Sequence, residues 1–345
     1  MTLAYVIRRV FSGLLLLFAL TLITFVLYFK IPSDPGQIFA GRGATPEEIA
    51  KIDHQLGLDR PVLDQYGSFV WRLVRHGDFG RSLAGVSVNE TLGSAMPVTA
   101  SIVVGGAIML LLLAFPLALL SAWKAHTAID RVVLLISIMG IALHPFVVGA
   151  VLRSVFSTHL GVLPYGVYCP LRGTGIDSVP TSGGFSIYTG TPPTCGGLAD
   201  WTTHLLLPWL TFAFFFLPLY TRMIRTRLLE TMGGQYVRTA RAKGASELRV
   251  LRRHVLKNAF LPIMTMLAMD MGTALTAAIY VETVFGLQGL GLTLINAING
   301  ETFYDLPFIV AVFVVVAATI IVLTLLVDLL YGLLDPRIRL RSKTA

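Results

Sequence analysis

Polar side chains that could do chemistry lie within and directly after one largely apolar stretch of the chain. Asp270 lies near the middle of residues 259–281, Thr273 and Thr276 follow within two turns, and Glu282 comes directly after the stretch. A run of about 20 apolar residues is long enough to cross a bilayer, and a carboxylate at that depth is costly unless it is paired or hydrated. We therefore expect these side chains to line a transport pathway, where Asp270 would attract an ammonium group or another cation.

Structural roles are open for both carboxylates. Asp270 is also suited to a hydrogen bond with a neighbouring helix or a partner chain, because polar side chains often join helices inside membranes. Glu282 is placed for gating at the outer face, and equally for capping a helix or pairing with an exterior arginine. The sequence contains no distance that separates these roles.

The two cysteines of the chain, Cys169 and Cys195, lie in one segment that is rich in Gly, Pro, Ser and Thr. On the oxidising side of a membrane, two cysteines in one loop favour a disulfide. Closing that loop would contribute roughly 3–4 kcal/mol by chain-entropy arguments. Two free thiols remain the alternative, since the sequence gives no geometry.

Motifs for catalysis and nucleotide binding are missing. The sequence has no Gly-Lys dipeptide, so it lacks the G-x-x-x-x-G-K-[ST] phosphate loop, and it lacks H-E-x-x-H. Its histidines are scattered without metal-ligand spacing. We therefore expect no enzyme activity, no cofactor and no metal in this chain, which argues against a membrane-embedded hydrolase.

A basic segment, residues 235–262, separates two apolar runs. Gln235–Lys243 predicts a helix of roughly 14 Å at 1.5 Å per residue. Gly244 is placed to end it, and Ser246 to cap a second helix with Glu247 in its first turn. A helix, a glycine corner and a second helix predict a docking element for a partner protein. Contact with anionic lipid headgroups is the alternative.

Composition places these features in an all-α membrane protein. Of 345 residues, 55% are hydrophobic and 13% are charged, against about 25% charged in ordinary soluble domains. Six apolar runs predict six transmembrane helices. They are residues 10–29, 97–123, 132–152, 205–221, 259–281 and 306–327.

Two local features qualify these runs. Arg8 and Arg9 precede the first run without an A-x-A-like cleavage site, which favours a retained anchor over a cleaved signal peptide. His144 and Pro145 lie inside the third run and predict a kink, because proline removes a backbone donor.

The distribution of basic residues sets the orientation. With both termini cytoplasmic, the inner face holds 18 of the 27 Lys and Arg, as the positive-inside rule expects. The net charge of +8 then describes the inner face of a protein embedded in membrane lipid and needs no nucleic acid. These residues lie at 8, 9, 124, 131, at ten positions within 222–257, and at 337, 339, 341 and 343.

The first exterior segment, residues 31–96, predicts two helices. Thr45 to Glu48 form a capping box, and the helix that follows would end at Gly57. A second helix would begin near Pro61 and end at Gly77. The side chains expected to be buried on it are Val62, Tyr66, Phe69, Val70 and Leu73.

Three parts follow from this pattern. Residues 1–96 would form the first transmembrane helix and the exterior helical segment. Residues 97–332 would form the transport domain, with an inner loop at 222–258 and an exterior loop at 158–200. Residues 333–345 would be a cytoplasmic tail.

The basic segment resembles the coupling-helix signature of ATP-binding-cassette importer permeases, in particular their dipeptide, oligopeptide and nickel branch. The resemblance assigns coupling to the ATPase to Gln235, Tyr236, Val237, Arg238, Thr239, Ala240, Arg241, Ala242, Lys243 and Gly244. Further matching fragments extend over some 335 residues. They are residues 5–9, 56–61, 65–66, 77–80, Ser82, 281–285, 289–291, 328–331 and 334–339.

The resemblance implies a type I importer permease fold and the first of two paired permeases. It implies a multi-pass protein of the cytoplasmic membrane that imports short peptides by alternating access. The implied partners are a second homologous permease, two ATPase subunits that hold ATP and Mg, and an extracytoplasmic solute-binding protein. Nickel chelates, haem or glutathione are alternative cargoes, and an ATP-independent secondary transporter is the alternative mechanism.

The chain departs from the family pattern at three places. Arg238-Thr239-Ala240 replaces the Glu-Ala-Ala of the general importer signature, and Lys257 replaces a proline. Gln288 stands where this branch usually carries proline. The first two changes suit the peptide branch and remove an acidic contact to the ATPase.

Overall fold

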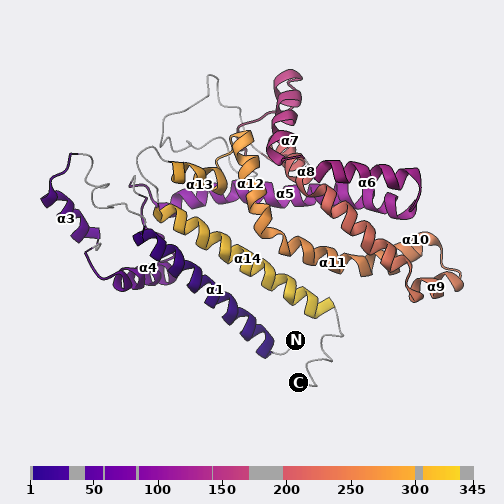
Figure 1. Ribbon diagram of the computed structural model, residues 1–345, viewed down its shortest axis with the longest axis horizontal. Helices are drawn as coiled ribbons and strands as arrows, with labels where there is room; N and C mark the ends of the chain where they lie inside the picture. The colour runs from indigo at the N-terminus through magenta and orange to yellow at the C-terminus, as the bar shows by residue number, and fades with distance from the viewer. Residues whose placement is uncertain are drawn as a thin grey trace. The chain divides into compact units, whose positions relative to one another are not determined.

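The computed structural model describes residues 3–30, 43–56, 59–82, 85–141, 143–170, 197–299 and 306–334. Within these ranges the regular elements are helices, apart from one isolated antiparallel bridge between Arg81 and Ser87. Figure 1 shows them in chain order. They are α1 (Leu3–Lys30), α3 (Pro46–Leu56), α4 (Val62–His76), α5 (Val88–Trp123), α6 (Ala128–Ile141), α7 (Pro145–Leu152), η1 (Arg153–His159), α8 (Leu198–Met232), α9 (Gln235–Ala242), α10 (Glu247–Val250), η2 (Leu251–Val255), α11 (Leu256–Met269), α12 (Met271–Phe285), α13 (Leu290–Asn299) and α14 (Leu306–Leu334).

The chain divides into two compact units. The terminal unit contains residues 1–96 and 293–345, and the middle unit contains residues 97–292. α14 and most of α13 belong to the same unit as the N-terminal segment, and the three parts expected from the sequence stay a prediction.

In the terminal unit, α1 lies beside α14 and also contacts α4 (Figure 1). Tyr66 of α4 is buried, and its hydroxyl lies 2.9 Å from that of Thr21 in α1. The Tyr66 ring meets Phe18 edge-on at 5.9 Å between centroids and Phe25 at 5.3 Å. An aromatic cluster therefore holds α4 against α1, the first apolar helix.

α3 and α4 form where the sequence analysis predicted two helices, but of the side chains expected to be buried Tyr66 is buried and Phe69, Val70 and Leu73 are half-buried. The backbone N–H of Thr45 donates to Glu48 Oε2 at 2.8 Å, and the N–H of Glu48 donates to Thr45 Oγ1 at 3.4 Å. This confirms the capping box, and the hydrogen bond from the Thr45 backbone holds the pKa of Glu48 below its usual value. The second helix, α4, ends at Gly77 as predicted. Gly57 and the side chain of Val62 lie outside the described residues.

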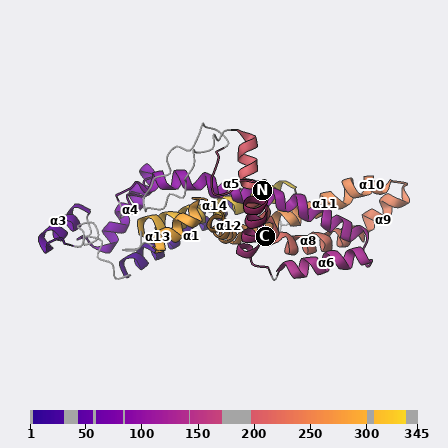
Figure 2. The same cartoon turned by 90° about the horizontal axis from the view of Figure 1, so that it is seen from above.

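The middle unit is built around α8. α6 runs side by side with α8, while α7, α11 and α12 pack against other parts of it (Figure 1, Figure 2). The largest fully buried side chains of its core include Tyr220, Phe212, Phe285, Ile102 and Leu205. The Trp209 indole N–H donates to the carbonyl of Ser101 at 2.9 Å, which ties α8 to α5.

Among the residues that the structure describes, three helices are long and apolar enough to cross a membrane: α5, α8 and residues 307–325 of α14. Two bent helix pairs, α6 with α7–η1 and α12 with α13, bring the number to five if each is one span. Residues 10–26 of α1 form a shorter apolar helix. The helical membrane architecture is confirmed, and the count of six spans stays a prediction.

Two of the predicted runs are broken. The third run bends by 101° between α6 and α7, and His144 accepts a hydrogen bond from the N–H of Phe146 at 3.3 Å at the start of α7. This confirms the predicted kink at His144 and Pro145. The fifth run, expected as one helix, is divided at Asp270 into α11 and α12.

Candidate functional site

The predicted docking element is a helix that ends at a glycine corner. The N–H of Gly244 donates to the carbonyl of Arg241 at 2.9 Å, and the N–H of Ala245 donates to that of Ala240 at 3.1 Å. These two bonds form a Schellman motif, which needs a left-handed residue between helix and exit. Gly244 supplies it with a φ of +78°. The predicted stop of this helix, α9, is confirmed.

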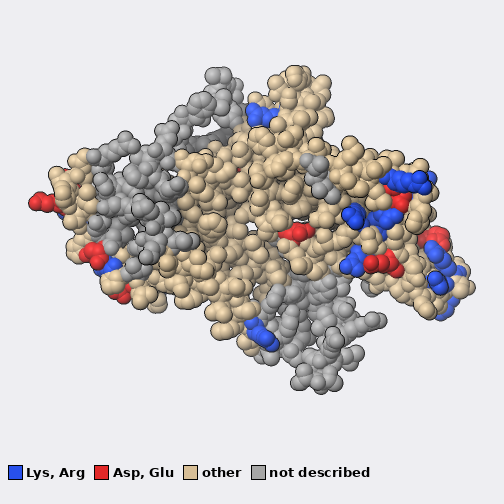
Figure 3. Space-filling model, viewed as in Figure 1, with Lys and Arg blue, Asp and Glu red and all other residues tan. Residues whose placement is uncertain are grey.

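One side of α9 is anchored and the other faces outwards. Val237 is fully buried and belongs to the core cluster of the middle unit, together with Val250 and Val255 of the following turns. Tyr236 and Arg238 are exposed. Figure 3 shows Lys and Arg gathered over the end of the middle unit that carries α9 and α10. The arrangement holds a basic surface in a fixed position.

An exposed ion pair braces the corner between α9 and α10. Arg241 donates through Nε to Glu247 Oε1 at 2.8 Å and through Nη2 to Oε2 at 3.0 Å. The sequence analysis assigned Arg241 to coupling with the ATPase and did not predict this ion pair. Ser246 takes the N-cap position of α10, but its side chain makes no capping hydrogen bond, so that part of the prediction is wrong.

A buried ion pair joins α8 to the first turn of α6. Arg225 donates to both carboxylate oxygens of Asp130, at 2.7 and 2.6 Å. Ser121 Oγ and the N–H of His126 donate to the same carboxylate at 2.5 and 2.8 Å. We call these four residues the Asp130 cluster. Sequence analysis missed it, because nothing local pairs Arg225 with an acid 95 positions away.

Asp270 lies at the break between α11 and α12. The hydroxyl of the buried Tyr220 donates to Asp270 Oδ2 at 2.7 Å, so the carboxylate bonds to a neighbouring helix through one oxygen. Thr273 Oγ1 donates to the Asp270 carbonyl at 2.7 Å. Thr273 and Thr276 are both exposed on α12. Their role in a pathway stays a prediction.

Glu282 is fully buried and serves as a cap. Its Oε1 accepts from Thr99 Oγ1 at 2.6 Å, and its Oε2 accepts from the N–H of Leu292 in the first turn of α13 at 2.8 Å. Thr99 Oγ1 in turn accepts from the N–H of Leu290 at 2.8 Å. A Cβ at Gly289 would lie 2.6 Å from Thr99 Oγ1 and overlap the carboxyl group, so only glycine fits. Thr99, Glu282 and residues 289–292 form what we call the Glu282 cluster.

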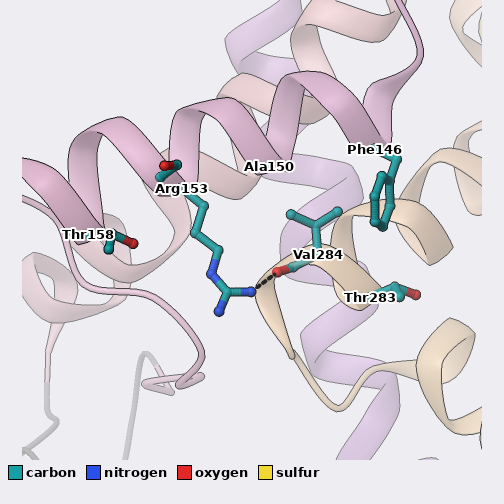
Figure 4. Close-up of a pocket in the computed structure, with 7 residues that line it drawn as sticks. Phe146, Ala150, Arg153, Thr158, Thr283 and Val284 are labelled. Atoms are coloured by element: carbon teal, nitrogen blue, oxygen red, sulfur yellow. Dashed lines mark hydrogen bonds between the residues drawn. The ribbon is translucent and has the colours of Figure 1, made fainter.

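A pocket opens between η1 and α12, as Figure 4 shows. Its volume is about 350 Å³, and Arg153 is the charged residue among those that line it. Cys169, which follows η1 along the chain, is buried and disulfide-bonded. Cys195 lies outside the described residues, so the predicted pairing of Cys169 with Cys195 stays a prediction.

The structure is that of a helical membrane protein with an exposed basic helix, α9, and with the buried carboxylates of Asp130 and Glu282. Residues 114–340 match the family model for the binding-protein-dependent transport system inner membrane component. Residues 2–103 match the model for the N-terminal part of such membrane components. The chain belongs to this family and is a multi-pass protein of the cytoplasmic membrane.

Curated relatives match over almost the whole chain. The dipeptide transport system permease protein DppB of Escherichia coli K12 is 34% identical over 339 residues, covering 98% of this chain and 99% of the relative. The di/tripeptide transport system permease protein DppB of Pseudomonas aeruginosa is 34% identical over 341 residues, with the same coverage. A solved structure of the MetNI methionine ABC transporter in an inward-facing conformation aligns with a TM-score of 0.48 at 15% identity, covering 69% of this chain and 93% of that one.

Proposed function

We propose that this chain is the first of two permease subunits in an ATP-driven, binding-protein-dependent importer of short peptides. The observation that carries the proposal is α9, which is anchored by Val237, stopped at Gly244 and exposed on its basic side. The peptide cargo is supported by the names of the relatives, which are dipeptide and di/tripeptide permeases.

The proposed topology has six transmembrane helices with both termini in the cytoplasm. It places α9 and α10 on the inner face, where the positive-inside rule favours their arginines. α1 would be the first span, and the bent pairs would each complete one span. The exterior side would then hold α3, α4 and the segment that contains Cys169.

In the proposed mechanism, two ATPase subunits bind ATP and Mg and close against each other below the membrane. Their closure would move α9, and the Schellman corner and the Arg241–Glu247 pair would pass that movement to α10 and η2. η2 continues directly into α11, which packs on α8. Nucleotide would thereby favour one of two arrangements of the membrane helices, which is a shift between existing states.

Cargo would arrive from an extracytoplasmic solute-binding protein, and a second homologous permease would complete the pathway. This chain would supply no catalytic group. Its contribution would be a surface that recognises the ATPase and a set of helices that move as the ATPase closes.

The proposal is tested with the complete complex in liposomes, by uptake of a labelled dipeptide. We expect uptake to require ATP inside, solute-binding protein outside and an intact α9. Arg238→Glu should abolish most uptake and release the ATPase during purification. Arg131→Glu is the matched control, because Arg131 is an exposed arginine of α6 on the same proposed face. Uptake without ATP would instead indicate a secondary transporter.

A further inference from the structure

The pocket between η1 and α12 combines apolar walls with one cation. The apolar part is formed by Phe146 and Ala150 of α7 and by Val284 of α12. The polar part includes Arg153 and Ser154 of η1. The remaining lining residues are Thr158 and Thr283. Small-molecule sites are commonly apolar pockets of about 300–1,000 Å³ with a few converging polar groups, and this pocket of about 350 Å³ has that character.

Arg153 is held in place before any ligand arrives. Its Nη1 donates to the carbonyl of Val284 at 2.6 Å, as Figure 4 shows. Its guanidinium lies over the ring of Tyr165, 4.2 Å from the centroid. These two contacts fix the plane of the guanidinium, and a fixed guanidinium loses little conformational entropy when it binds an anion.

The charge of Arg153 is not neutralised by the part of the chain that the structure describes. Among those residues, the carboxylates that form ion pairs have His54, Arg225, Arg227 and Arg241 as partners. The hydrogen bond from Arg153 to Val284 uses one of five guanidinium N–H groups and goes to a neutral carbonyl. A partly buried cation of this kind favours an anionic ligand.

The π-helical form of η1 explains why hydroxyls accompany the cation. η1 spans Arg153–His159 and has i→i+5 hydrogen bonds, which bring residues five positions apart onto one face. Arg153 and Thr158 are five apart and both line the pocket. An α-helix would turn Thr158 away from Arg153. π-Turns recur at functional sites, where they place side chains that an α-helix would separate.

We propose that this Arg153 pocket binds the terminal carboxylate of a short peptide. The guanidinium would form charge-assisted hydrogen bonds with the carboxylate, and the hydroxyls of Ser154 and Thr158 would donate to the same group. Phe146, Ala150 and Val284 would contact the adjoining side chain of the cargo. The inference rests on the proposed function, whose topology places the pocket at the extracytoplasmic ends of the third and fifth spans. Cargo released by the solute-binding protein would meet it there.

The test compares a free-acid dipeptide with its C-terminal amide in the reconstituted complex. Each peptide is used at a concentration that saturates the solute-binding protein, whose affinity for both is measured separately. We expect the wild type to prefer the acid, and Arg153→Gln to lower uptake of the acid about tenfold while changing uptake of the amide less than about twofold. Arg153→Lys keeps the charge and should retain the preference for the acid.

An equal loss of uptake of both peptides in the Arg153→Gln variant would overturn the proposal, since it would show that Arg153 only joins η1 to α12. Unchanged uptake of both would overturn it as well. Failure of the wild type to take up either peptide would count against the proposed function instead. A second measurement then addresses the pocket itself: free-acid dipeptide should slow the modification of Arg153 by phenylglyoxal, followed by mass spectrometry, and the amide should not. Equal protection by both peptides, or by neither, would contradict a carboxylate site.

Discussion

The corner between α9 and α10 and the Glu282 cluster use similar residue types in opposite ways. At the corner, Arg241 and Glu247 are both exposed, with side chains 46% and 61% accessible. In the Glu282 cluster, the carboxylate is fully buried, and both of its oxygens accept hydrogen bonds from the chain itself. The corner leaves hydrogen-bond donors accessible at the surface, whereas the carboxylate of Glu282 forms its hydrogen bonds within the chain.

This difference distinguishes a surface suited to contact with a partner protein from a cluster that stabilises the fold. A buried polar group contributes only when it is fully hydrogen-bonded, so the Glu282 cluster fixes the turn into α13 and offers nothing to a partner. Exposed pairs contribute little to stability and remain available for contacts with another protein. Accessibility, more than residue type, therefore supports the proposed recognition of the ATPase by α9 and assigns a structural role to Glu282.

The Asp130 cluster is a second buried polar cluster, and its disruption should cause the largest loss of unfolding free energy. Arg225→Ala leaves the carboxylate of Asp130 buried without its cation, which should lower the free energy of unfolding by about 3–5 kcal/mol. Thermal unfolding of the purified protein measures this change. Arg227→Ala is the matched control, because Arg227 pairs with Glu230 on the exposed side of the same helix and should cost less than about 1 kcal/mol. Equal losses of unfolding free energy in the two variants would contradict the distinction between the buried ion pair and the exposed one.

Glu282→Ala should have the next largest effect. It leaves the hydroxyl of Thr99 and the N–H of Leu292 without their acceptor, for a loss of about 2–3 kcal/mol. Glu282→Gln should lose less, because its amide oxygen still accepts one of the two bonds. The same unfolding assay measures both variants, with Glu230→Ala on the exposed side of α8 as the control. A fully stable Glu282→Ala protein would argue against the cap.

Within α9 itself, the anchored and exposed sides should respond differently. Val237→Ala removes buried methyl groups and should cost about 2 kcal/mol of unfolding free energy. Tyr236→Ala changes an exposed side chain and should leave stability within about 0.5 kcal/mol. It should nevertheless weaken co-purification of the ATPase about tenfold, as expected for an aromatic contact in an interface. Loss of stability in Tyr236→Ala would contradict the division of α9 into two sides.

The smallest effect is expected for the brace at the corner. A double-mutant cycle on Arg241 and Glu247 should give a coupling energy of about 0.2–1 kcal/mol, because both side chains are exposed. The coupling should fall as salt is raised, since screening acts on exposed charges. A coupling that is large and independent of salt would show that the pair is buried in the assembled protein.

Local features of the fold were predictable from the sequence, and long-range pairings were not. The stop at Gly244, the capping box at Thr45 and the break at His144 each depend on a few neighbouring residues. Three decisive contacts instead join residues far apart in the chain. They are Arg225 with Asp130, Glu282 with Thr99, and Arg153 with Val284, at separations of 95, 183 and 131 residues.

The same limit applies to the polar residues of the fifth run. The sequence identified Asp270 and Glu282 as costly in a membrane, which is a property of each residue alone. It left open whether each carboxylate faces a pathway or a neighbouring helix, because that depends on where α8, α5 and α13 pass. The bonds to Tyr220 and Thr99 identify one neighbour of each carboxylate, and a role of either carboxylate in a pathway stays a prediction.

Cross-linking from α9 tests the central claim most directly. The substitution Arg238→Cys introduces a cysteine into α9, and the protein with its native cysteines alone is the control. The introduced cysteine should form a cross-link to the ATPase subunit in membranes that contain the assembled complex. It should also resist membrane-impermeant thiol reagents added to intact cells, because α9 is proposed to lie inside. Labelling of this cysteine from outside intact cells, without any cross-link to the ATPase, would contradict the account.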